Sequence, residues 1–166
     1  FAPSNPGLVY ASVGDEECLV SGKCEQAGGG VMVSRDGGTS REKTTINSGI
    51  VLGIDIFAKD SNAAYAAVVG GGLYRTEDGG KVWHLINANP GTSSMLKVDP
   101  DPKELILAAL AIDPTNFDKL YAGFRDGSLM VSLDGGVTWE GPMEGIPPEA
   151  DVVALAVDQH DPDVVY

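Results

Sequence analysis

Carboxylates at repeated positions are the side chains of this sequence that are best suited to chemistry. Asp15 and Asp126 each stand five residues after a tyrosine, namely Tyr10 and Tyr121. Hydrolysis of a glycosidic bond typically uses two carboxylates that flank the bond, one of them often with a raised pKa. Because the two aspartates hold equivalent positions, they could face one another across a cleft. They are the candidate catalytic pair of a polysaccharide-active hydrolase.

Other catalytic arrangements are missing from the sequence. There is no Gly-x-Ser-x-Gly motif, and neither His84 nor His160 stands near a serine or cysteine that could act as a nucleophile. The glycine run 28–30 lacks the strand and helix that frame a phosphate-binding loop. A zinc site needs four nitrogen or sulfur ligands, and both histidines are far in sequence from Cys18 and Cys24. We therefore expect no metal and no other cofactor.

Composition and charge exclude two classes of partner. The 166 residues include 24 acidic and 11 basic side chains, which give a net charge of -13 at pH 7. Such a surface opposes binding to a phosphate backbone, so we expect no nucleic acid. Hydrophobic residues make up 43% of the chain, enough for a packed core. No apolar run approaches the ~20 residues of a membrane-spanning helix, so we expect no membrane span.

The two cysteines indicate the compartment of the protein. Cys18 and Cys24 are six positions apart in a polar stretch, which predicts a small loop closed by a disulfide. Two free surface thiols are the alternative. Because disulfides persist in oxidising compartments, the pair favours an exported protein that is extracellular, on the cell surface or periplasmic.

A segment that closes on a tyrosine occurs four times and indicates a repeat. It combines a polar turn with a short apolar strand and ends at Tyr10, Tyr65, Tyr121 and Tyr166. The spacings are 55, 56 and 45 residues (65−10, 121−65, 166−121). A period of this length suits one small antiparallel sheet per repeat.

Strand signals follow the same order in every repeat. An apolar run precedes the tyrosine strand, and a short strand then leads into an Asp-Gly-Gly turn and a fourth strand. Four strands joined by tight turns, repeated about every fifty residues, predict the blades of an all-β propeller. The apolar runs are 51–57, 107–112 and 152–157, the short strands are 30–34, 72–76 and 128–132, and the fourth strands begin at Lys81 and Val137.

The motif Ser/Thr-x-Asp-Gly-Gly occurs three times, each time between two predicted strands. Asp-Gly favours a tight hairpin, because glycine tolerates positive φ and the aspartate accepts hydrogen bonds from turn amides. The preceding hydroxyl can hold the same turn, and a following tryptophan can pack on the sheet. One carboxylate per turn does not supply the six to eight oxygens of a calcium site. We expect a structural role for Ser34, Asp36, Gly38, Thr76, Asp78, Gly80, Trp83, Ser132, Asp134, Gly136, Thr138 and Trp139.

This motif resembles the Asp-box, or bacterial neuraminidase repeat. The copy 132–139 matches it at every defined position, whereas Val82 replaces a hydroxyl residue in the second copy and Arg41 replaces the tryptophan in the first. The chain thus resembles exported Asp-box propellers, which include sialidases, xyloglucanases, sortilin-type receptors and a photosystem assembly factor. The resemblance implies that the turns lie opposite the usual ligand face. That face would be built by loops that follow the second and fourth strands.

One ligand-side loop is longer than its counterparts. From the tyrosine to the aspartate of the turn, the first repeat has 26 residues (36−10), whereas the other two have 13 each (78−65, 134−121). Such an insertion on a rigid scaffold can bind a partner, although a merely decorative acidic loop is the alternative. Arg125 is the only arginine clearly placed in a ligand-side loop, which disfavours a sialidase. The candidate partner-binding residues are Asp15, Glu16, Glu17 and Arg125.

These observations predict a partial propeller of about three blades and the start of a fourth, within a ring of six to eight blades. The ring would be completed by the same polypeptide or by another copy. We expect a non-catalytic extracellular module for protein interaction or structural assembly, with a protein or polysaccharide partner. The alternative is a xyloglucanase-like glycoside hydrolase that uses Asp15 and Asp126. The predicted blades are 1–50, 51–96, 97–150 and 151–166.

Overall fold

The computed structural model describes residues 4–13, 29–68, 72–88, 107–124, 127–143 and 150–166. These residues form three antiparallel sheets, which we call the first, second and third sheet in chain order. The first sheet contains β1 (Val9–Val13), β2 (Gly30–Ser34) and β3 (Glu42–Lys43). The second contains β4 (Val51–Ile56), β5 (Ala64–Val68), β6 (Gly72–Thr76) and β7 (His84–Asn87), and the third β8 (Leu107–Ile112), β9 (Leu120–Phe124) and β10 (Leu129–Ser132).

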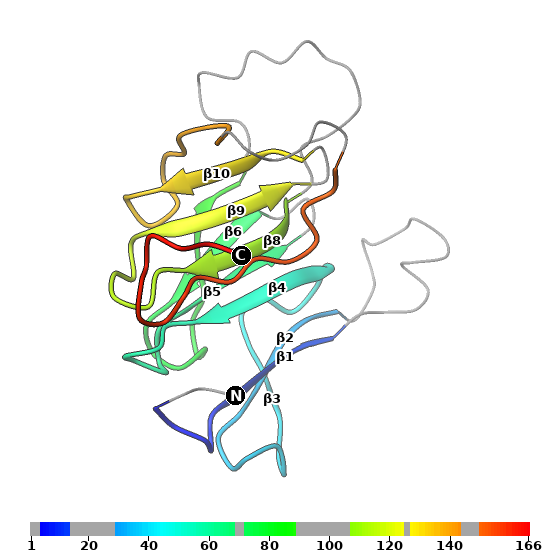
Figure 1. Cartoon of the computed structure of the whole chain (residues 1–166). Helices are drawn as coiled ribbons and strands as arrows, with labels where there is room; N and C mark the ends of the chain where they lie inside the picture. Colours follow the sequence, from blue (N-terminus) through cyan, green and yellow to red (C-terminus); the bar gives the residue numbers. More distant parts are fainter. Residues whose placement is uncertain (1–3, 14–28, 69–71, 89–106, 125–126, 144–149) are drawn as a thin grey trace.

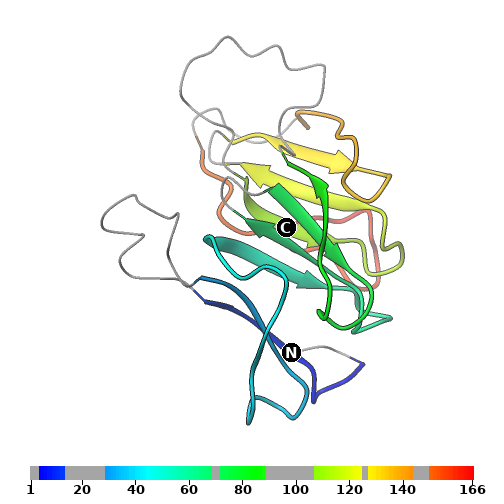
Figure 2. The same ribbon diagram turned by 180° about the vertical axis from the view of Figure 1, so that it is seen from behind.

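Within each sheet the strands follow one another in the order of the sequence. The second sheet has the order β4-β5-β6-β7, and the third lies beside it with β8 against β4. Figures 1 and 2 show the first sheet below the second and the third above it. Residues 150–166, which we call the C-terminal segment, fold back on themselves through an antiparallel bridge between Val157 and Val165. The segment therefore continues the series beyond the third sheet.

The sheets pack through their middle strands. All five residues of β5 and all five of β9 are buried. Small residues in these strands allow close approach: a Cβ added to Gly123 would lie 2.2 Å from Cγ1 of Val152 in the C-terminal segment. One core cluster joins the second and third sheets, and it contains Tyr65, Ala67, Leu73, Leu107, Ile112, Leu120, Ala122, Phe124, Met130 and Trp139.

Several strand predictions are confirmed. Strands β2, β6 and β8 have the predicted bounds 30–34, 72–76 and 107–112, and β4 ends one residue before the predicted limit. The reason is that each of these three strands ends at a turn with a strong sequence signal, Asp-Gly-Gly after β2 and β6 and Asp-Pro after β8. The all-β architecture of antiparallel sheets is thus established by the structure.

The predicted starts of the fourth strands are wrong. β7 begins at His84 rather than Lys81, and the third sheet has only a bridge between Val131 and Glu140 where a strand from Val137 was expected. Hydrogen bonds within the turn explain why the fourth strands start later than predicted. In the second turn Asp78 accepts the amides of Lys81 and Val82, and in the third turn Asp134 accepts the amide of Thr138, so these amides are not available to pair with a strand.

The place of the tyrosines also differs from the prediction. Tyr10, Tyr65 and Tyr121 are each the second residue of a strand rather than its last. A tight turn closes immediately before each strand, and in the second sheet it is the hydrogen bond from Ala63 N to Asp60 O at 3.0 Å. The strand therefore starts one residue before the tyrosine and continues for three residues beyond it.

Truncation of Leu73 should strongly destabilise the protein, because this fully buried residue of β6 packs between the second and third sheets. We expect Leu73→Ala to lower the free energy of unfolding by about 2–5 kcal/mol. Urea denaturation followed by circular dichroism measures the change. The matched control is Leu85→Ala on β7, where the side chain is 51% exposed, and equal losses for both variants would contradict this packing.

Candidate functional site

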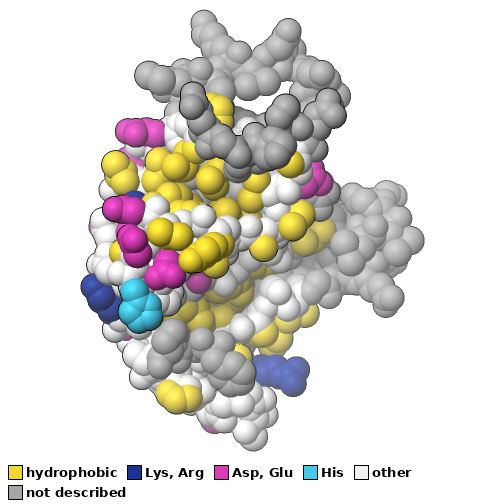
Figure 3. Space-filling view, viewed as in Figure 1, with side chains coloured by type: hydrophobic (Ala, Val, Ile, Leu, Met, Phe, Trp, Pro, Cys, Tyr) yellow, Lys and Arg dark blue, Asp and Glu magenta, His cyan; other side chains and the backbone are white. Residues whose placement is uncertain are grey.

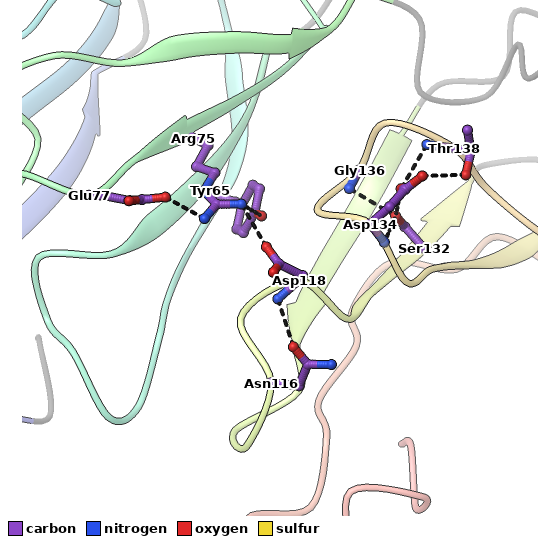
Figure 4. A network of polar contacts seen from close by, with 9 residues as sticks. All are labelled: Tyr65, Arg75, Glu77, Asn116, Asp118, Ser132, Asp134, Gly136 and Thr138. Carbon is purple, nitrogen blue, oxygen red and sulfur yellow. Dashed lines mark hydrogen bonds and ion pairs between the residues drawn. The ribbon is translucent and has the colours of Figure 1, made fainter.

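The third Asp-Gly-Gly turn is closed by a network of side-chain hydrogen bonds (Figure 4). The Ser132 hydroxyl donates to Oδ1 of Asp134 at 2.9 Å and accepts the amide of Gly136 at 2.8 Å. On the far side of the turn, Thr138 donates its amide to Asp134 Oδ1 at 2.8 Å and its hydroxyl to Oδ2 at 2.5 Å. One hydroxyl and one carboxylate thus connect both ends of the turn.

The first turn has the same network. Ser34 donates to Asp36 Oδ1 at 2.8 Å and accepts the amide of Gly38 at 2.8 Å. Ser40 takes the place of the later threonine, with its amide 2.8 Å from Oδ1 and its hydroxyl 2.7 Å from Oδ2 of Asp36. The missing tryptophan of this copy therefore leaves the hydrogen bonds of the turn unchanged.

The second turn replaces one hydrogen bond of the network. Thr76 donates to Asp78 Oδ1 at 2.9 Å and accepts the amide of Gly80 at 3.1 Å. Val82 has no hydroxyl, so Asp78 Oδ1 accepts two amides instead, from Lys81 at 2.9 Å and from Val82 at 3.1 Å. In all three copies both glycines have positive φ, which a residue with a Cβ rarely adopts.

The turn carboxylates are stabilised in their charged form. The amide and hydroxyl of Ser40, followed by the hydroxyl of Ser34, lower the pKa of Asp36 to about 2. For Asp78 and Asp134, burial acts to raise the pKa, but hydrogen bonds within the turn outweigh it, and the pKa is lowered. A carboxylate with a lowered pKa is a poor general acid near neutral pH. The arrangement can hold a hairpin and does not suit acid catalysis.

Arg75 connects the second sheet to the third (Figure 4). Its Nη1 lies 2.7 Å from Oδ1 of Asp118 and donates to the hydroxyl of Tyr65 at 3.2 Å, and the guanidinium also pairs with Glu77. The Cζ atom lies 4.4 Å from the ring centroid of Phe117. These contacts hold Arg75 at the boundary of the two sheets.

The third turn docks at this boundary. The amide of Gly135 donates to the carbonyl of Asp118 at 2.8 Å. A Cβ added to Gly135 would lie 3.0 Å from Arg75 Nη1, and one added to Gly136 would lie 2.3 Å from Cδ2 of Leu73. The turn therefore fits against side chains of the second sheet, and its glycines are needed for that close approach.

The first and second sheets meet in the same way. The amide of Gly79 donates to Asn62 O at 3.0 Å, and Arg35 of the first sheet donates to Gly79 O at 3.0 Å. A Cβ added to Gly80 would lie 2.6 Å from Cε1 of Tyr10. An arginine and a tyrosine of one sheet thus cover the turn of the next. Sequence reasoning missed this pair of arginines, because Arg35 follows the hydroxyl residue of its turn whereas Arg75 precedes it.

The two tryptophans differ in their hydrogen bonds, although both are buried. Trp139 Nε1 donates to the carbonyl of Gly136 at 3.1 Å. Trp83 packs edge-on against Tyr10 with ring centroids 5.9 Å apart, and its Nε1 has no partner among the described residues. The packing role predicted for both tryptophans agrees with their burial.

The predicted ligand-side residues fall outside the described part of the chain. They are the candidate catalytic pair, the candidate partner-binding loop and the two cysteines: Asp15, Glu16, Glu17, Cys18, Cys24, Arg125 and Asp126. Their roles stay predictions.

A groove lies between β4, β8 and the C-terminal segment, which crosses in front of them in Figure 1. Its volume is about 310 Å³. Figure 3 shows hydrophobic side chains gathered in the middle of this face, with acidic side chains along one flank. The three elements contribute the same repeat positions, namely Gly53, Ile54, Asp55, Ile56 and Ala58, then Leu110, Ala111, Ile112 and Pro114, and last Leu155, Ala156, Val157 and Gln159.

Asp55 is the one titratable side chain among the described residues that line the groove. Its Oδ2 accepts the amide of Ile112 at 2.7 Å, across the boundary between the sheets, and its Oδ1 accepts the amide of Ile56 at 2.9 Å. Burial raises the pKa of Asp55, and the two amides offset this only in part. Aligning VLGIDIF with LAALAI could have revealed it, because Ala111 and Ala156 hold the corresponding positions.

The described residues contain neither a cluster of metal ligands nor a membrane-spanning helix. In the described ranges, no three His, Cys, Asp or Glu residues gather in a way that could hold a metal ion. The same ranges contain no helix that is long and apolar enough to cross a membrane.

Acid should destabilise the protein through the turn carboxylates. A carboxyl group whose folded pKa is depressed adds stability above its unfolded pKa and loses it as the pH falls through the folded value. For Asp36 this window runs from about 4, the unfolded pKa, down to about 2. We expect Asp36→Asn to flatten the pH dependence of the unfolding free energy in that window. Urea titrations between pH 2 and pH 5 measure it, and the exposed Asp151→Asn serves as control.

Comparisons with known proteins identify the fold. No protein-family model matches the chain, and no curated protein matches it. Among solved structures, it is similar to an ancestral GH74 enzyme, at 20% identity over 97% of this chain and 22% of that one, with a TM-score of 0.66. It is also similar to the GH74 xyloglucanase of Xanthomonas campestris, at 19% identity over 89% of this chain and 23% of that one, with a TM-score of 0.64.

The chain therefore spans less than a quarter of the length of these structures. A structure described as YCF48 bound to D1 peptide also matches, at 18% identity over 68% of this chain and 34% of that one, but its TM-score of 0.46 is too low to support an argument. At such identities the likeness establishes the fold alone. The three sheets are successive blades of a partial β-propeller.

Proposed function

We propose that this chain is a segment of an Asp-box propeller that acts as a non-catalytic extracellular module for protein interaction or structural assembly. The Asp-box assignment rests on the three turns, where a hydroxyl, a carboxylate and a glycine amide form the same hydrogen bonds. We further propose the blade limits 1–50, 51–96, 97–150 and 151–166. The ring of six to eight blades is completed by the same polypeptide or by another copy.

The observation that carries this proposal is the way the described carboxylates are used. Asp36, Asp78 and Asp134 accept hydrogen bonds from their own turns, and Asp118 pairs with Arg75 between two sheets. Among the described residues that line the groove, Asp55 is the one carboxylate, whereas glycoside hydrolysis typically needs two. Contacts within the scaffold thus account for the four carboxylates Asp36, Asp78, Asp134 and Asp118, which supports a structural use of these side chains.

The partner-binding part of the proposal concerns the long ligand-side loop. Asp15, Glu16 and Glu17 stand in the inserted segment, and Arg125 in the corresponding segment of the third repeat. A disulfide between Cys18 and Cys24 would close that loop and reduce the entropy lost on binding. The partner is a protein or a polysaccharide, and the compartment is extracellular, cell-surface or periplasmic.

A second candidate function is glycoside hydrolysis. It is favoured by the similarity to GH74 enzymes, one of which is described as a xyloglucanase. In this case Asp15 and Asp126 would be the acid and the second carboxylate. Because the chain spans 22% and 23% of those enzymes, the rest of an active site would have to come from further blades.

An activity assay separates the two functions. Incubation of the protein with xyloglucan, other glucans and sialosides, followed by detection of reducing ends, should show no hydrolysis. The variants Asp15→Asn and Asp126→Asn should match the wild type. Asp161→Asn, which changes an exposed carboxylate of the C-terminal segment, is the control. Hydrolysis that is lost in either of the first two variants but kept in the control would establish the enzyme instead.

The disulfide has an independent test. Mass spectrometry of the unreduced protein after treatment with iodoacetamide should find Cys18 and Cys24 unmodified and joined in one peptide pair. After reduction both should be alkylated. Alkylation of both cysteines without reduction would show that the loop is open.

A further inference from the structure

The groove between β4, β8 and the C-terminal segment contains a carboxylate that the repeat does not require. The corresponding positions of the next two repeats hold Ala111 and Ala156, and β8 still packs against the C-terminal segment with alanine at position 111. Ala111, Val157 and Tyr121 pack in one cluster between the third sheet and the C-terminal segment. A carboxylate at position 55 is therefore not needed for two blades to pack.

The carboxylate of Asp55 is partly buried in the groove and forms no ion pair with a described residue. The described residues provide it with two amide hydrogen bonds and no ion pair. Burial of a negative charge is costly unless a positive charge or sufficient hydrogen bonds compensate it. The raised pKa of Asp55 reflects this cost. A cation placed in the groove would offset it.

The shape and lining of the groove narrow the choice of cation. Its volume of about 310 Å³ is at the lower end of small-molecule sites, which run from about 300 to 1,000 Å³. Most lining residues are apolar, such as Ile54, Leu110 and Leu155. A carboxylate offers about four acceptor positions, and two are used by amides. An apolar stem that ends in one compact charge with several donors fits this environment, and lysine has that structure.

We propose that the groove binds a lysine side chain of a partner protein, with Asp55 as its counter-ion. The net charge of -13 also favours a basic partner, because opposite charges attract across an interface. This proposal rests on the proposed role as an interaction module and adds a specific site to it. The two can fail separately, because a module could bind its partner through the ligand-side loops alone.

A titration with two small ligands tests the site. Nα-acetyl-lysine N-methylamide and Nα-acetyl-norleucine N-methylamide share the apolar stem of the side chain, and only the first carries an ammonium group. Binding to the ¹⁵N-labelled protein is followed by NMR at the amide of Ile112, which donates to Asp55. We expect the lysine derivative to bind at least about tenfold more tightly, the effect of a charge-assisted hydrogen bond.

Two variants complete the test. Asp55→Asn keeps an oxygen that can accept the Ile112 amide and should abolish the preference for lysine, whereas Asp151→Asn outside the groove should keep it. Equal affinity of the wild type for both ligands would overturn the proposal, and this comparison does not depend on any variant. A preference that persists in Asp55→Asn would overturn it as well. The xyloglucan assay stays independent of both results.

Discussion

The interaction on which the structure depends is the hydrogen bond network of one hydroxyl and one carboxylate in each Asp-Gly-Gly turn. The hydroxyl accepts the amide of the second glycine, and the carboxylate accepts the amides beyond it. This network holds both glycines at positive φ. The first glycine then donates its amide to the loop that precedes the tyrosine strand of the same sheet, as Gly135 does to Asp118. These hydrogen bonds make the turn a rigid element at one edge of its sheet.

The second and third turns are also the places where neighbouring sheets contact one another. Arg35 and Tyr10 of the first sheet contact the second turn, and Arg75 and Tyr65 of the second sheet surround Gly135 of the third. Side chains with a large contact area and fixed donors are thus concentrated at the boundaries. The binding proposed above is assigned instead to the ligand-side loops and to the groove beside β4. The repeated aspartates thus form hydrogen bonds within their own turns. Asp55, which has no acidic counterpart in the next two repeats, is the better candidate for recognition.

Much of this architecture could be predicted from the sequence, because its signals are local. Alternating apolar residues and Asp-Gly pairs determine β2, β6 and β8 and the turns that follow. The starts of the fourth strands could not be predicted, since they depend on which amides the carboxylate of the turn binds. The arginine contacts could not be predicted from the sequence either. Arg35 and Arg75 stand at different places in their repeats, yet each lies beside the turn of the next sheet.

The candidate site was predicted less well than the fold. The sequence drew attention to charged residues of the predicted ligand-side loops, such as Asp15 and Arg125. These residues lie outside the described ranges. Asp55 escaped notice because a lone aspartate in an apolar strand resembles an ordinary exposed position. Its significance depends on the approach of Ile112 from another sheet, 57 residues away in the chain.

The central claim is that the second and third turns are rigid elements docked against the sheet that precedes each of them, and native-state hydrogen exchange measures it most directly. The amides of Gly135 and Gly136 should exchange as slowly as those of β9. In Arg75→Met their protection should fall, while Gly37 and Gly38 of the first turn keep theirs. If the amides of Gly135 and Gly136 exchange in the wild type at the rate of an open loop, or are unaffected by the loss of Arg75, the third turn is not docked and the claim is wrong.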